Sequence, residues 1–207
     1  MKNAFVKKSV GILSVGAILC VAATGACADT TEGPYVGLGV GMYQTDVTIS
    51  AGGFSSSAGD TSHDFGADVF AGYKWNMGVG GVAIEVGYTD SYGKVTDWTG
   101  PGNAFSAKIT ESKEIAVLPS YNLGKDTAAY IRLGYASAKG TETVTNAAGS
   151  SKTFTGFVWG LGVDHSVAKN VALRAEYKVL DLSSDTTGTT SFKPRAAGLN
   201  IGLRYAF

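Results

Sequence analysis

The chain has 207 residues, and its 17 basic and 17 acidic side chains cancel. It contains no run of basic residues and no acidic tail, which argues against nucleic acid as a partner. Glycine is frequent, at 29 residues, without a collagen period or a low-complexity block, which is typical of strands whose glycines face a crowded space.

The chain opens with a segment that has the features of a secretory signal. A basic start precedes an apolar run at Val10–Ala23, and the tripeptide Ala26-Cys27-Ala28 fits the small-residue pattern before a cleavage site. The run is short for a membrane-spanning helix. A lipoprotein signal on Cys27 is the other alternative, but the residues before it lack the usual leucine. We therefore expect a cleaved signal peptide at residues 1–28 and one mature domain at residues 29–207, which would contain no cysteine.

From residue 35 onward, apolar residues alternate with small or polar ones. A period of two residues is typical of a β-strand with one apolar and one polar face. The alternation occurs in eight windows: Tyr35–Met42, Phe65–Trp75, Val82–Tyr88, Glu114–Tyr121, Ala129–Tyr135, Gly156–Asp164, Val171–Val179 and Arg195–Phe207. The last window is long and ends on an aromatic residue, as the closing strand of a membrane barrel would.

The two faces of these windows differ sharply in composition. The alternating apolar residues form a face without charge or glycine, whereas the intervening positions carry ten charges and twelve glycines. A soluble barrel of the lipocalin type would keep its charges in water, where nothing restricts them to one parity of glycine-rich strands. The pattern therefore predicts an all-β fold, an eight-stranded antiparallel transmembrane β-barrel with up-and-down meander topology, lipid outside and a polar interior.

The connections between the windows alternate in length. We expect long loops at about Tyr43–Asp64, Thr89–Lys113, Ala138–Thr153 and Asp181–Lys193, and short turns at Asn76–Gly81, Asn122–Thr127 and His165–Asn170. Outer-membrane barrels have long extracellular loops and short periplasmic turns. This pattern predicts that both ends of the mature chain lie in the periplasm.

Aromatic residues on the apolar face fall near the strand ends, which predicts two girdles at the membrane interfaces. The expected periplasmic girdle is Tyr73, Trp75, Tyr121, Tyr205 and Phe207, and the expected outer girdle is Tyr88, Tyr135, Phe157 and Trp159. Pro119 does not fit the pattern well, because a barrel strand needs every backbone N–H group to be paired. Its position near a periplasmic turn makes it tolerable.

The inward-facing charges are balanced. They are Asp68, Glu85, Glu114, Asp164 and Glu176 against Lys74, Arg132, Arg174, Lys178 and Arg204. An eight-stranded barrel is only wide enough for its own side chains, so these charges are expected to pair. Inward glycines, notably Gly37, Gly39 and Gly41, would leave room for long Arg and Glu side chains. The alternative is a path for protons or small ions.

Three short motifs are better explained without a specific site. Gly37–Gly41 has part of a dinucleotide-loop spacing, but it lies within a strand and no helix follows. Asp164-His165-Ser166 invites a catalytic interpretation, yet its His and Ser are adjacent and lie at a periplasmic turn. His63 with Asp60 and Asp64 could hold a cation only weakly, because no second His or Cys is near. We expect no catalytic, cofactor-binding or metal residue, no cofactor and no enzymatic activity.

These features together resemble the small eight-stranded outer-membrane barrels, in particular the opacity-type surface proteins and the OmpA- and OmpX-like membrane domains. The segments that carry the resemblance are Tyr35–Gly41, Ala83–Tyr88, Gly160–Val163, Leu173–Tyr177 and Arg204–Phe207. The resemblance covers the whole mature chain and implies location in the bacterial outer membrane. It also implies that the strand ending in Phe207 is read by the outer-membrane assembly machinery. It says little about function, because such proteins include adhesins, structural anchors and narrow pores.

The loops are the expected working surface, because function usually sits on loops held by a rigid scaffold. Trp98 and Phe105 could anchor a partner, and the first loop is slightly acidic through Asp46, Asp60 and Asp64. No basic patch of the heparin-binding kind is present in the loops. We predict a surface protein with a structural, antigenic or adhesin-like role that contacts outer-membrane lipid and a host or surface ligand. The alternative is a narrow porin-like channel for ions or small solutes.

Overall fold

The computed structural model describes residues 32–51, 54–59, 64–100, 103–144, 150–187 and 190–207. The predicted signal peptide lies outside these described residues. Eight long strands form the barrel: β1 (Gly33–Ala51), β3 (Asp64–Asn76), β4 (Gly80–Thr89), β6 (Asn103–Asn122), β7 (Thr127–Val144), β8 (Ser150–Ala168), β9 (Val171–Leu182) and β11 (Thr190–Ala206). Each predicted window falls on one of them.

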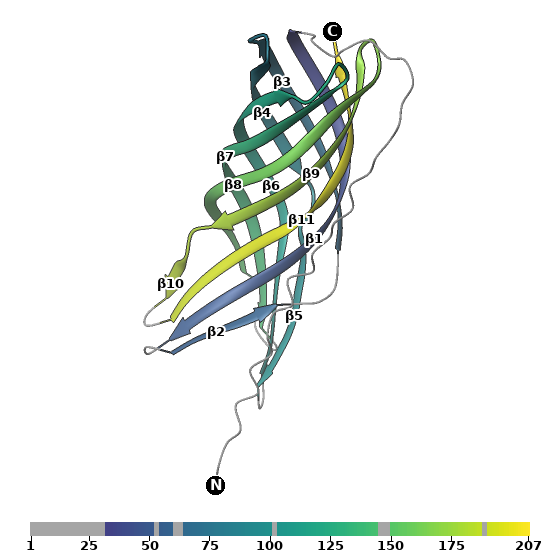
Figure 1. Ribbon diagram of the computed structural model, residues 1–207. Coiled ribbons are helices and arrows are strands. Elements are labelled where there is room, and N and C mark those ends of the chain that lie inside the picture. Colours follow the sequence, from purple (N-terminus) through teal and green to yellow (C-terminus); the bar gives the residue numbers. More distant parts are fainter. Residues whose placement is uncertain (1–31, 52–53, 60–63, 101–102, 145–149, 188–189) are drawn as a thin grey trace, which may run out of the picture.

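The barrel closes without an open edge in its wall. Each strand pairs with its neighbours in chain order, antiparallel throughout, and β11 pairs back onto β1 from Tyr35↔Ala206 to Ala51↔Thr190. Closure satisfies the backbone polar groups inside the sheet, which the hydrocarbon region of a bilayer requires. The predicted eight-stranded antiparallel meander is therefore confirmed (Figure 1).

None of the described residues belongs to a helix that is long and apolar enough to cross a membrane.

The long outer loops are a correction to the sequence-based prediction. The strands continue well past the apolar windows, and three short strands extend the sheet: β2 (Phe54–Gly59) pairs with β1, β5 (Gly93–Gly100) with β6, and β10 (Asp185–Thr187) with β11. These three strands lie at the end of the barrel away from the C-terminus (Figure 1). Alternation missed them because both faces of a strand that leaves the bilayer meet water, so the pattern stops while the hydrogen-bonded ladder continues.

The turns at the opposite end are short, as predicted. Only residues 77–79, 123–126 and 169–170 separate the paired strands there. In the first turn, Gly78 has a φ of 78°, which favours glycine, and the Met77 N–H donates to the Gly80 carbonyl at 2.8 Å. The pairing of β6 with β7 is interrupted at Pro119, since Leu118 and Pro119 have no partner in the β6–β7 register. Proline has no N–H to donate, which accounts for the gap.

The outer surface of the barrel is apolar across its middle. Leu38, Val40, Leu161 and Ile201 are all exposed, and so is every member of the two predicted aromatic girdles. Exposed apolar side chains around a closed sheet are what a lipid-facing wall requires. Val179 is the exception, because it is buried although its parity directs it outward; its register partners are Trp159 and Ala197.

Candidate functional site: the charged barrel interior

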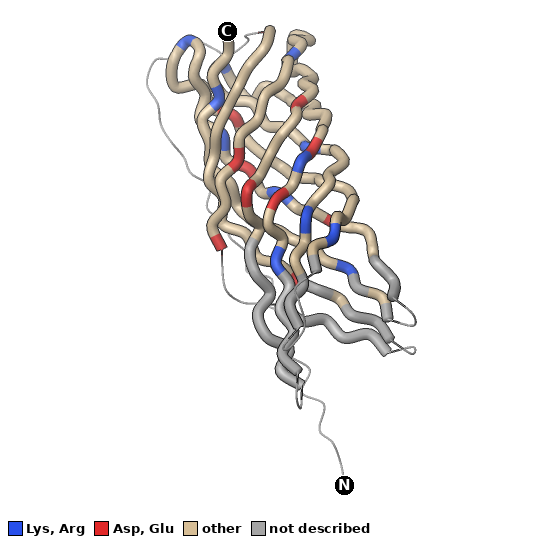
Figure 2. Tube along the Cα trace, turned by 180° about the vertical axis from the view of Figure 1, so that it is seen from behind, with Lys and Arg blue, Asp and Glu red and all other residues tan. Residues whose placement is uncertain are grey.

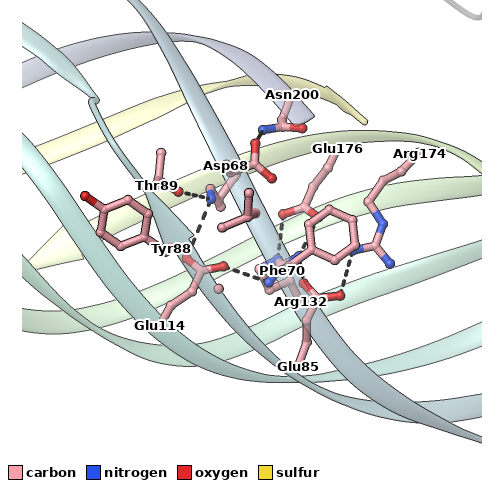
Figure 3. Close-up of a pocket in the computed structure, with 13 residues that line it drawn as sticks. Asp68, Phe70, Glu85, Tyr88, Thr89, Glu114, Arg132, Arg174, Glu176 and Asn200 are labelled. Carbon is pink, nitrogen blue, oxygen red and sulfur yellow. Dashed lines mark hydrogen bonds and ion pairs between the residues drawn. The ribbon is translucent and has the colours of Figure 1, made fainter. Parts of the chain in front are cut away.

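Arg132 on β7 is the centre of the interior. Its guanidinium binds three carboxylates: Nη2 lies 2.6 Å from Glu85 Oε1, Nη1 lies 2.8 Å from Glu114 Oε1, and Nε lies 2.6 Å from Glu176 Oε1. The three acids come from β4, β6 and β9, so one arginine ties together strands around the barrel (Figure 3). All four residues are buried, and the fork of guanidinium donors suits several carboxylates at once.

A second set of ion pairs surrounds Arg174 on β9. Its Nη1 lies 2.7 Å from Glu85 Oε2, and its Nε lies 2.9 Å from Asp164 Oδ1. Asp164 also forms an ion pair with Arg204, whose Nε lies 3.3 Å from Asp164 Oδ2. Nearer the outer end of the barrel, Lys178 Nζ lies 3.6 Å from Glu114 Oε2. The acidic and basic residues intermingle at mid-height of the described barrel, as Figure 2 shows.

The expectation that the interior charges pair is confirmed for eight of the ten, and wrong for Lys74 and Asp68. Asp68 is hydrogen-bonded by the side-chain amide of Asn200 rather than by a cation. Both charges lie on β3 and face inward, but six residues separate them, a span of about 20 Å along a strand. Equal numbers of opposite charges therefore do not pair completely here.

The inward glycines make room for aromatic rings as well as for the charged side chains that were predicted. A Cβ on Gly37 would lie 2.1 Å from Cζ of Phe70, and one on Gly41 would lie 2.5 Å from the ring of Tyr43. The space beside these glycines is therefore filled by aromatic rings. Gly39, Gly87 and Gly160 lie beside acidic side chains as expected, because a Cβ at these positions would meet Asp68, Glu114 and Glu176 respectively.

Replacing Gly37 with alanine is expected to destabilise the folded barrel by about 1–3 kcal/mol, because a packed ring cannot move aside without disturbing its neighbours. The matched control is Gly124→Ala in a periplasmic turn, where a new Cβ has nothing within 4 Å. Urea unfolding in lipid vesicles measures both variants. Equal midpoints for the two would contradict the packing argument.

The ionic network lies between two buried apolar clusters. One contains Tyr43, Tyr92, Phe154 and Leu180, and the other contains Tyr35, Phe70, Leu118 and Tyr130. Two small cavities lie beside the network, one of about 10 Å³ next to Arg132 and one of about 20 Å³ next to Lys74. Each is comparable to the space that one or two water molecules need. The described interior is therefore filled by its own side chains.

The structure separates the members of the motifs that we set aside. Ser166 faces inward and is buried, whereas His165 Nδ1 lies 2.9 Å from Thr127 Oγ1, and Ser166 Oγ has no hydrogen-bond partner. His and Ser therefore do not form a nucleophile–base pair. Asp60 and His63 lie outside the described residues. No group of residues suited to a metal ion occurs in the part of the chain that the structure describes.

The outer end of the wall carries ion pairs that the sequence pattern did not indicate. Lys139 Nζ lies 2.6 Å from Glu111 Oε1, and Tyr88 donates to the same carboxylate at 3.3 Å. The hydrogen bond from Lys139 to Glu111 lowers the pKa of Glu111, and the same bond raises the pKa of Lys139. These groups are exposed above the outer aromatic girdle, so the pair adds little to stability.

A closed antiparallel barrel with an apolar wall and a charged, filled interior is a transmembrane β-barrel. Residues 13–207 match the family described as "Outer membrane protein beta-barrel domain", and the chain belongs to that family. It is 30% identical over 191 residues to a "22 kDa outer membrane protein" of Rhizobium leguminosarum bv. viciae, covering 86% of this chain and 80% of that protein. The protein is therefore a small barrel of the bacterial outer membrane.

Solved structures of other barrels are similar at low sequence identity. Neisserial surface protein A is 19% identical, with 84% of this chain and 97% of that chain covered and a TM-score of 0.49. Ail of Yersinia pestis is 15% identical, with 83% and 99% covered and a TM-score of 0.43.

Proposed function

We propose that this protein is a non-enzymatic scaffold of the outer membrane that presents its outer hairpins as an interaction surface. The observation that carries the proposal is the filled interior. Arg132 and its three carboxylates span the lumen, and apolar clusters lie on both sides of the network. A barrel filled in this way can hold a surface in place, and its lumen leaves no room for a solute.

The narrow-channel alternative meets two physical obstacles. The interior cavities, of about 10 and 20 Å³, are too small for a continuous column of water. To open a path, the protein would have to separate Arg132 from buried carboxylates at 2.6–2.8 Å, and leaving a buried charge without its partner is costly. Both observations support the scaffold.

The outer hairpins provide the candidate surface. Trp98 and Phe105, which the sequence analysis placed in a loop, lie on β5 and β6, and the strand register sets them directly opposite each other. Neighbouring positions across an antiparallel pair belong to the same face of the sheet. The two paired positions are therefore our candidate contact point for a protein or glycan partner.

Trimming residues 52–58 and 99–106 to short turns is expected to leave folding and membrane insertion intact. The described part of the first segment, residues 54–58, pairs with the outer end of β1, and loop closure depends weakly on length. Surface binding by whole cells should be lost, while the heat-modifiable folded form persists on gels. Full binding by the trimmed barrel, or steady ion-selective conductance of the intact protein in planar bilayers, would favour the channel instead.

We also propose that the C-terminal strand is recognised by the outer-membrane assembly machinery through Phe207. The ring is exposed and lies 5.3 Å from that of Tyr205, and the Phe207 N–H donates to the Pro34 carbonyl at 3.1 Å. Removal of the ring from lipid accounts for about 1.5–3 kcal/mol. Deleting Phe207 is expected to reduce assembled barrel in cells far more than Phe157→Ala, which removes a similarly exposed aromatic from the outer girdle. Equal levels of assembled protein would contradict recognition.

A further inference from the structure

The periplasmic end of the lumen has an excess of positive charge. The cavity of about 20 Å³ at this end is lined by three cationic side chains, Lys74, Arg174 and Arg204, and by one carboxylate, Asp164. All three cations are more than nine-tenths buried, with exposed fractions of 7%, 3% and 2%. Buried charges of one sign this close together require compensation.

The carboxylates nearby are already in use. Asp164 Oδ1 binds Arg174 at 2.9 Å, and its Oδ2 lies 3.2 Å from Arg174 Nη2 and 3.3 Å from Arg204 Nε. Glu85 is shared between Arg174 and Arg132 and also accepts a hydrogen bond from Tyr35. Both acids are therefore engaged with the arginines and not with Lys74.

Lys74 is the residue that this arrangement leaves without an ion pair. Among the described residues, no carboxylate oxygen lies within 4.0 Å of its Nζ, although Asp164 lines the same cavity. The nearest acid on its own strand, Asp68, is about 20 Å away along β3. Lys74 is therefore the cation of this cavity that can bind an anion from outside the protein.

We propose that the cavity beside Lys74, at the periplasmic end of the lumen, binds a small inorganic anion of the halide class. Lys74 and the neighbouring arginines would hold the ion. The cavity volume fits an ion that replaces one or two water molecules and excludes a large organic acid. Lys74 lies two residues before the end of β3 at Asn76, so an anion reaches it from the periplasm. Arg204 is held beside the site by the ring of Tyr35, 5.1 Å from its Cζ.

The anion stops inside the barrel. On the side of the site toward the outer end of the barrel lie Glu85, Glu114 and Glu176, which repel a negative ion and are themselves paired with Arg132. The site therefore offsets a local excess of positive charge at the periplasmic end and is no step in conduction.

Chloride-35 NMR line broadening with the refolded barrel in a zwitterionic detergent tests the site. We compare the wild type with Lys74→Gln and with Lys125→Gln, which removes an exposed lysine from a periplasmic turn. The expected result is saturable broadening in the wild type and in Lys125→Gln, and affinity weakened about tenfold or more in Lys74→Gln. Equal broadening by all three proteins, or none by the wild type, would overturn the proposal.

A second measurement covers the case in which Lys74→Gln fails to fold. Crystals of the wild-type barrel grown in sodium bromide are expected to show an anomalous peak within contact distance of Lys74 Nζ. Peaks at the protein surface alone mean an adventitious ion only, and they would also refute the site. Both tests are independent of the surface-binding assay, because the outer hairpins lie at the other end of the barrel (Figure 1).

Discussion

Replacing Arg132 with methionine is expected to destabilise the folded barrel by about 3–5 kcal/mol, the range for removing one partner of a buried ionic cluster. Methionine keeps much of the side-chain volume but leaves Glu85, Glu114 and Glu176 facing one another without their shared cation. Acid protonates carboxylates, so part of the loss should return as the pH falls. Urea unfolding in lipid vesicles at two pH values measures both effects.

The matched control is Lys139→Met on the same strand. Lys139 also binds a carboxylate at 2.6 Å, but its side chain is half exposed at the outer end of the wall. Because solvent screens such a pair, no measurable change is expected. If the two variants unfold at the same urea concentration, the interior network does not hold the barrel together, and the argument for a permanently filled lumen fails.

Replacing Ile201 with arginine is expected to cost about 2–4 kcal/mol, the penalty for a cation on the lipid face near the middle of the membrane. Ile201 is exposed on β11 between Val40 and Ala175, so its side chain points away from the lumen into the apolar band. Refolding into vesicles followed by urea titration gives the loss directly. A loss near zero would place this face in water.

Ala197→Arg is the control for Ile201→Arg, because it lies on the same face of the same strand about 13 Å nearer the outer end. Its two neighbours in the register are Val179 and the polar Gln44, which marks the end of the apolar band, and a cost of about 0–1 kcal/mol is expected there. Asn200, which faces the lumen, is a poor control. It hydrogen-bonds Tyr43 and Asp68 in a crowded interior, so arginine there would be overpacked.

Much of the interior could be predicted from residue parity alone. All ten charges expected to face inward do so, and the aromatic residues expected at the two interfaces are exposed on the outer face. Parity is informative here because a bilayer imposes a strong penalty on charge at one face, so the charged residues of each strand collect on the other. The short periplasmic turns followed from the same pattern.

Parity says nothing about partners on other strands. That Arg132 binds three acids while Lys74 binds none depends on strand register and on the position of each residue along the barrel axis. The same limit explains Gly37, whose missing side chain makes room for Phe70 on the neighbouring strand rather than for an arginine. These are contacts between residues far apart in the chain.

The sequence by itself determined the fold class, the lipid-facing surface and the identity of the buried charges, because the membrane restricts each position of a strand independently of its neighbours. Only the tertiary structure decided which charges pair, that the outer loops are extended hairpins, and that Trp98 lies opposite Phe105. These features depend on register and barrel closure, and beyond the bilayer no hydrophobic period remains to reveal a strand.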